Sequence, residues 1–220
     1  MTDLSSAAIV GDIASDLPGA AEVFRRNGIS FCCGGKHSLA EAAKKTGIAV
    51  EDLLTDLRAL SAAAGRDAPE KTVPLIDHIL SRYHQSHREE LDWLIPLAQK
   101  VEAVHGDHDD APLGLTDALI SLRDDLESHM SKEEQILFPM MRQGGHPMIV
   151  HPIAVMRHEH DTTADMLRAV EHVTNGLRLP DGACRSWTKL YTGLSKLTND
   201  LVTHIHLENT VLFPRFEVAN

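Results

Sequence analysis

The sequence has few cysteines, no long apolar run and no excess of basic residues. Three cysteines in 220 residues do not make a disulfide framework, so we expect a reducing compartment, the cytoplasm. No stretch approaches the about 18 apolar residues of a membrane span, and the first residues lack the basic and apolar regions of a signal peptide. The 21 Lys and Arg against 32 Asp and Glu give a net charge of −11, which argues against binding to nucleic acid or anionic membranes.

Strand patterns are also missing, because no run alternates apolar and polar residues with a period of two. Histidine, in contrast, is abundant: there are 14, and all except His37 lie beyond residue 77. Either the later part of the chain binds metal or it carries many surface imidazoles, and composition alone leaves both open.

One pattern occurs twice, 75 residues apart: leucines, then His-x-x-x-Glu, then Leu-Phe-Pro. The leucines recur at alternating intervals of four and three, which is the core-facing spacing of a bundled helix, and Ile136 continues it in the first copy. His129 and Glu133, and likewise His204 and Glu208, stand where this spacing requires apolar residues. Burying such groups is costly unless something pairs with them, and a metal bound by both copies is the simplest partner.

We predict an all-α protein with a small N-terminal helical domain over residues 1–62, a linker over 63–73 and a four-helix bundle over 74–220. In the small domain, Ser38 and Glu41 form a capping box at the start of one helix. Pro96 should kink the first long helix or end its regular part. The predicted helices cover 18–26, 38–47 and 51–60 in the small domain, and about 74–104, 115–142, 152–175 and 182–216 in the bundle.

The repeat extends to the helix before each motif, since His84 with Leu91 matches His160 with Leu167. The bundle therefore resembles two duplicated helical hairpins, which pack in an up-down-up-down arrangement. Six polar side chains should converge near the pseudo-two-fold axis: His84, His129, Glu133, His160, His204 and Glu208.

Four imidazoles and two carboxylates suit a centre of two metal ions. Each Glu can bridge both ions and each ion can take two His, which leaves positions for an oxo or hydroxo bridge and an external ligand. Mixed nitrogen and oxygen donors with open positions favour iron, while zinc and manganese stay open. His87, one turn after His84, is either a further imidazole of the site or a satisfied core residue. Glu159 is either a neighbour of the site or a solvated charge.

Cys32 and Cys33 precede the capped helix in the segment Phe-Cys-Cys-Gly-Gly-Lys. The positive end of a helix and nearby basic side chains favour the thiolate. Redox exchange, handling of nitric oxide and transient iron binding are all compatible with this pair, and so is simple packing.

The cysteine segment, followed by a helical domain with these His and Glu positions, resembles the repair-of-iron-centres proteins, the ScdA-like di-iron proteins with a hemerythrin-like domain. The resemblance spans the whole chain. It implies a non-haem di-iron centre on the six His and Glu residues above, a redox role for Cys32 and Cys33, and repair of iron–sulfur clusters during nitrosative or oxidative stress.

Three functions follow from this resemblance. The first is repair, by donation of iron, handling of nitric oxide or both, with damaged iron–sulfur proteins and an electron donor as partners and nitric oxide as a ligand. The second is an enzyme that reduces nitric oxide to nitrous oxide at the di-iron centre. The third is a carrier or sensor of oxygen or nitric oxide. We favour repair. The sequence does not decide between a monomer and a homodimer.

Overall fold

A computed structural model describes residues 4–31, 35–66 and 68–217 of the chain. Within these residues there is no strand, only an isolated bridge between Ile9 and Ser38, so the all-α prediction is confirmed. None of the helices in these ranges is long and apolar enough to cross a membrane.

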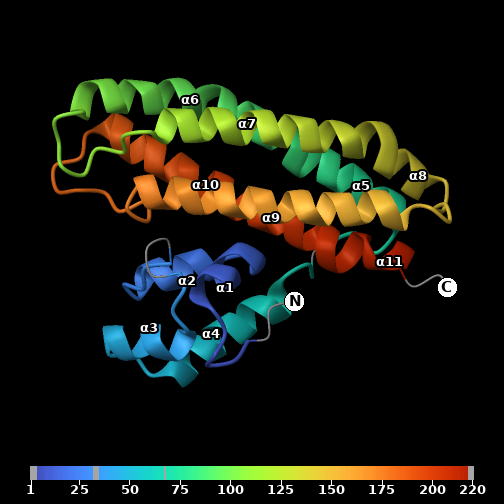
Figure 1. Cartoon of the computed structure of the whole chain (residues 1–220), viewed down its shortest axis with the longest axis horizontal. Coiled ribbons are helices and arrows are strands. Elements are labelled where there is room, and N and C mark those ends of the chain that lie inside the picture. Colours follow the sequence, from blue (N-terminus) through green and yellow to red (C-terminus); the bar gives the residue numbers. More distant parts are fainter. Residues whose placement is uncertain (1–3, 32–34, 67, 218–220) are drawn as a thin grey trace.

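The N-terminal part consists of short helices packed on one side of a long bundle (Figure 1). The predicted capping box is present, because the Glu41 backbone N–H donates to the Ser38 hydroxyl and the Ser38 N–H donates to the Glu41 carboxylate at 2.8 Å. The first of these helices was not predicted, and the last runs past residue 60. The helices are α1 (Val10–Asp16), α2 (Ala20–Arg26), α3 (Leu39–Thr46) and α4 (Val50–Ala63).

The rest of the described chain forms four long helical rods, three of which contain a π-helical turn. The rods lie side by side in Figure 1, with α6 packed against α7 and α10, and α7 against α9. The first two rods are α5 (Thr72–Ile79), η1 (Leu80–His84) and α6 (Gln85–His105), and α7 (Leu115–Lys132), η2 (Glu133–Leu137) and α8 (Phe138–Arg142). The second two are α9 (Val150–Val173), and α10 (Arg185–Leu207), η3 (Glu208–Leu212) and α11 (Pro214–Glu217).

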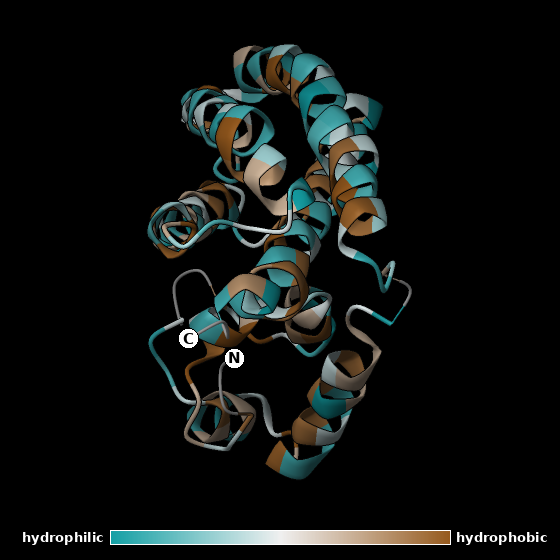
Figure 2. Ribbon diagram, turned by 90° about the vertical axis from the view of Figure 1, so that its right-hand side faces the viewer, coloured by the Kyte–Doolittle hydropathy of each residue, from teal (hydrophilic) through white to brown (hydrophobic). Residues whose placement is uncertain are grey.

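Each rod is amphipathic, and hydrophobic and hydrophilic residues alternate along the same ribbons in Figure 2. The buried apolar side chains of the bundle form two clusters. One contains Leu122, Leu126 and Leu201, and the other contains Leu137 and Phe213. The predicted polar residues lie between these clusters, so apolar side chains enclose them from both ends of the bundle.

The π turns explain where the predicted helical period fails. In each turn a backbone N–H donates to a carbonyl five residues earlier, as from Phe213 to Glu208 at 2.8 Å. Pro139 and Pro214 each follow such a turn, and the wider turn relieves the contact between a proline ring and the preceding carbonyls. The extra residue also rotates the helix, so Ile136 is 55% exposed and Leu137 is buried in its place.

Of the two outcomes expected at Pro96, a kink or an end of the regular helix, the second is wrong, because α6 continues through the proline to His105. Leu94 and Ala98 on either side of the proline are fully buried in the bundle core. Tertiary packing of this kind offsets the about 3 kcal/mol that a proline costs in a helix interior.

Polar contacts join the N-terminal helices to the bundle. Arg25 on α2 donates to Glu171 on α9 at 2.8 Å, and Arg168 donates to the hydroxyl of Ser15 at 2.8 Å. Glu171 is buried, so this pair lies inside the contact between the two parts of the chain rather than on its rim.

Candidate metal centre

All four rods contribute to one buried polar cluster in the middle of the bundle. Two members begin π turns, Glu133 in η2 and Glu208 in η3, and His84 ends η1. Each member is at most 3% exposed: His84, His129, Glu133, His160, His204 and Glu208. The structure therefore brings together the six residues that the duplicated pattern singled out.

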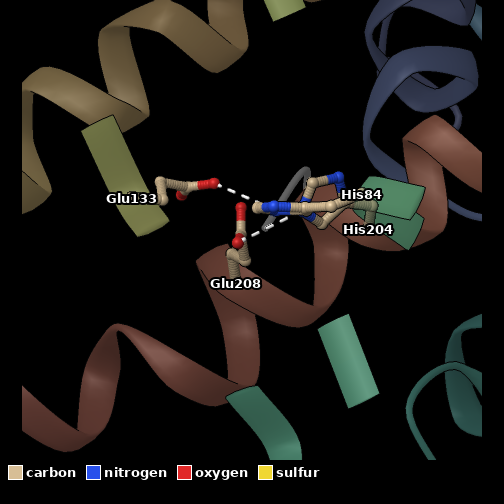
Figure 3. A group of neighbouring side chains, drawn as sticks. All are labelled: His84, Glu133, His204 and Glu208. Carbon is tan, nitrogen blue, oxygen red and sulfur yellow. Dashed lines mark hydrogen bonds and ion pairs between the residues drawn. The ribbon is translucent and has the colours of Figure 1, made fainter. Parts of the chain in front are cut away.

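The six side chains form two groups of four that share both carboxylates. His84 and His204 complete one group, and His129 and His160 complete the other. Within each group the candidate ligand atoms all lie within 4.8 Å of one another. Figure 3 shows Glu133 and Glu208 pointing toward His84 and His204 in the first group.

The distances between the imidazoles and the carboxylates suit a shared cation better than hydrogen bonds. Nε2 of His84 is 3.4 Å from Glu133 Oε2, and Nε2 of His204 is 3.2 Å from Glu208 Oε1. None of the four carboxylate oxygens has a hydrogen bond to any residue that the structure describes. Two donors about 2.1 Å from one ion, at 90–110° to each other, are about 3.0–3.4 Å apart. The donor set and its spacing thus fit metal ions, and unpaired buried carboxylates are costly without them.

Burial and the neighbouring members of the cluster shift the pKa values of its side chains. Burial, together with the neighbouring Glu208, raises the pKa of Glu133 well above its usual value. Burial lowers the pKa of His84 to about 4, with a further contribution from His204, and it lowers that of His129 to about 4 beside His160. Neutral imidazoles are the form that binds metal, so these two residues are ready to act as ligands at neutral pH.

Three of the imidazoles are held from behind at Nδ1. His84 donates to Glu134 at 2.8 Å, His129 donates to Glu159 at 3.0 Å, and His160 donates to Asn209 Oδ1 at 3.0 Å. These bonds orient each ring so that Nε2 faces the carboxylates.

Basic side chains support the three acceptors. Arg88 donates to Glu134, Lys132 to Glu159 and Arg157 to Asn209. Glu159, which the sequence left open as a neighbour of the site or a solvated charge, is bonded to His129. Glu134 and Asn209 were missed, although each directly follows the Glu of a motif copy, and this shared position was the available signal.

His87 lies next to the cluster but belongs to neither group of four. It is fully buried, and its ring centroid is 5.3 Å from that of His204 and 6.1 Å from that of Tyr83. Neither ring nitrogen has a hydrogen bond to the described part of the chain. The contacts of His87 therefore do not support the alternative in which it is a core residue with its hydrogen bonds satisfied.

Cys32 and Cys33 lie outside the described residues. The residues on either side are fixed to the N-terminal helices: Arg25 lies over the ring of Phe31 at 5.6 Å, and the Gly11 N–H donates to the Gly35 carbonyl at 3.0 Å. A Cβ on Gly35 would stand 2.3 Å from the Phe31 carbonyl oxygen, so this close approach requires glycine.

Comparison with known proteins gives matches to both parts of the chain. Residues 75–216 match the hemerythrin HHE cation binding domain, and residues 6–61 match ScdA_N, a domain of unknown function (DUF542). The chain is 44% identical over 210 residues to the iron-sulfur cluster repair protein YtfE of Shigella boydii serotype 4, with 94% of each chain covered. The YtfE proteins of Escherichia coli O139:H28 and of the K12 strain DH10B match with the same identity and coverage.

Proposed function

The chain belongs to the hemerythrin HHE family and to the family of YtfE iron-sulfur cluster repair proteins, and from this we propose that it repairs iron–sulfur clusters by donating iron from a two-ion store. The clients would be iron–sulfur proteins damaged by nitric oxide or oxidants. The domain limits 1–62 and 74–220 and the redox role of Cys32 and Cys33 are part of the same proposal.

One observation carries the proposal: two groups of four buried donors share Glu133 and Glu208. Such sharing supports a pair of ions rather than one, because each carboxylate lies within 3.4 Å of a histidine Nε2 in both groups. Histidine and carboxylate ligands suit iron, and they leave coordination positions open to an external ligand that could take the ion away.

In this function the bound iron is the cargo, and the side chains control how firmly it is held. The four imidazoles present their Nε2 atoms to the two carboxylates, which supply negative charge between them. Glu134, Glu159 and Asn209 fix the orientation of three imidazoles. The apolar clusters at both ends keep water away from the cluster, so release requires a change in the ligands rather than simple hydration.

The test is to purify the protein without added metal, and to measure its metal content and Mössbauer spectrum. We expect two coupled irons per chain. On incubation with an apo-ferredoxin, sulfide and a reductant, iron should pass to the ferredoxin while the repair protein stays folded by circular dichroism. A double variant, Glu133→Gln with Glu208→Gln, is the matched control and should carry little iron.

Two results would contradict the proposal. One is a single zinc ion per chain in place of the iron pair. The other is production of nitrous oxide from nitric oxide over many turnovers with no iron lost to the ferredoxin, which would identify an enzyme instead.

A further inference from the structure

The four imidazoles of the cluster are supported unequally. His84, His129 and His160 each bond through Nδ1 to a side chain of another helix. Nδ1 of His204 is buried and has no hydrogen bond to any residue in 4–31, 35–66 or 68–217. The group of His129 and His160 therefore has two supporting acceptors, while the group of His84 and His204 has one.

The duplication shows where the missing acceptor should be. Glu159 directly precedes His160 and accepts from His129, which lies on the neighbouring rod. The equivalent position directly precedes His84 and is occupied by Tyr83. The Tyr83 ring stacks on His204, with centroids 5.5 Å apart and planes 5° from parallel. A stacked ring cannot accept a hydrogen bond from an N–H in the plane of the imidazole.

The cation that supports the acceptor is missing at the equivalent position as well. Lys132, three residues after His129, donates to Glu159. Three residues after His204 the chain has Leu207, which is buried. The group of His84 and His204 thus has a tyrosine and a leucine where the other group has an acceptor and its cation, so the difference between the two groups is consistent at both equivalent positions.

His87, a further buried polar side chain near His204, does not replace the acceptor. The ring of His87 is 5.3 Å from that of His204, yet neither of its nitrogens bonds to His204. In metal sites, an acceptor on the outer nitrogen makes a ligand imidazole more basic and fixes its direction, and loss of the acceptor commonly lowers metal affinity by about 10- to 100-fold.

We propose that the two groups hold their ions unequally, and that the group containing His84 and His204 releases its iron first. Tyr83 sets this order by withholding an acceptor from His204. The inference rests on the proposed function, iron donation, and specifies which of the two ions is delivered.

The first experiment uses the unaltered chain. Crystals of the iron-loaded protein are soaked briefly in reductant and a ferrous chelator, and the anomalous signal of iron is followed at both positions. We expect the position beside His84 and His204 to empty first. Equal loss, or earlier loss beside His129 and His160, would overturn the inference while the proposed function stands. A chain that holds no pair of ions would end both.

The second experiment follows iron release to the chelator in solution. The wild type should show a fast and a slow phase of equal amplitude. Tyr83→Glu introduces the acceptor that the other half has, and should slow the fast phase about tenfold or more while leaving the slow phase unchanged. The mirrored variant, Glu159→Tyr, should accelerate the slow phase.

Ser81→Glu is the matched control, because it adds the same charge at an exposed position two residues away, and it should release iron as the wild type does. If Tyr83→Glu does not fold, Tyr83→Gln supplies an uncharged acceptor, as Asn209 does for His160. Tyr83 variants that change both phases alike, or neither phase, would refute the role of Tyr83.

Discussion

At the residue scale, His129 links burial of the site to acid sensitivity. Its side chain is 2% exposed, and burial followed by the neighbouring His160 lowers its pKa from 6.5 to about 4. Between these two pH values the unfolded chain binds a proton that the folded, metal-free chain does not. Stability from this residue is therefore fully present above pH 6.5 and is lost as the pH falls toward 4.

We predict that His129→Leu changes this pH dependence. Leucine at this position has no proton to bind. The free energy of unfolding of the metal-free variant should therefore rise relative to that of the metal-free wild type as the pH falls from 6.5 to 4. The gain should be about 3 kcal/mol, from 1.36 kcal/mol per pKa unit. Urea unfolding of both proteins at pH 7, 5.5 and 4 measures it. A difference that stays constant with pH would show that His129 titrates alike in the folded and unfolded chains.

Repetition made the six donors predictable from sequence, because His and Glu interrupt the same apolar spacing twice. The groups behind them were harder to find. Glu134 and Asn209 bond to imidazoles on a different rod, and which residue reaches which ring depends on the rotation of each helix. The π turns at Glu133 and Glu208 set that rotation, and a period of 3.6 residues does not include them.

At the element scale, the long rods were predicted well and the short helices less well. The second of the duplicated rods begins at Leu115 and the third ends at Val173, close to the predicted limits 115 and 175. Helix α1 was missed because it has seven residues, too few for a periodic signal, and it is stabilised by contacts. The Val10 N–H donates to the His37 carbonyl at 3.0 Å, a bond across 27 residues that no local pattern predicts.

The capping box of α3 allows a direct test at this scale. Ser38→Ala removes the hydroxyl that accepts from the Glu41 N–H, and we expect a loss of about 1 kcal/mol in the free energy of unfolding. Ser38→Asp keeps an acceptor and should retain most of the stability. Urea unfolding followed by circular dichroism compares the three proteins. No loss in Ser38→Ala would show that the side-chain cap does not stabilise α3.

At the scale of the whole molecule, one ion pair ties the N-terminal helices to the bundle. Arg25 and Glu171 have side chains that are 15% and 6% exposed, and their charges meet at 2.8 Å. Burial raises the pKa of Glu171 even though Arg25 opposes the rise. A buried carboxylate that loses its partner is strongly destabilising, while removal of both charges costs far less.

We therefore predict that Arg25→Ala lowers stability by about 3 kcal/mol, and that the pair Arg25→Leu with Glu171→Leu lowers it by less than that single change. Hydrogen exchange of α2 and α9 should rise in the single variant. A double-mutant cycle from urea unfolding gives the coupling energy. Additive losses would show that the two charges stabilise their own helices rather than the contact between the two parts.

Each donor group is assembled from both helical hairpins of the chain. Each group takes one histidine from the first hairpin and one from the second, and it needs a carboxylate from both. A symmetric pair of identical hairpins would have to make two identical positions. Because the peptide linkage joins hairpins that differ in sequence, the two positions can differ in their surroundings, and the proposed release of one ion before the other depends on this difference.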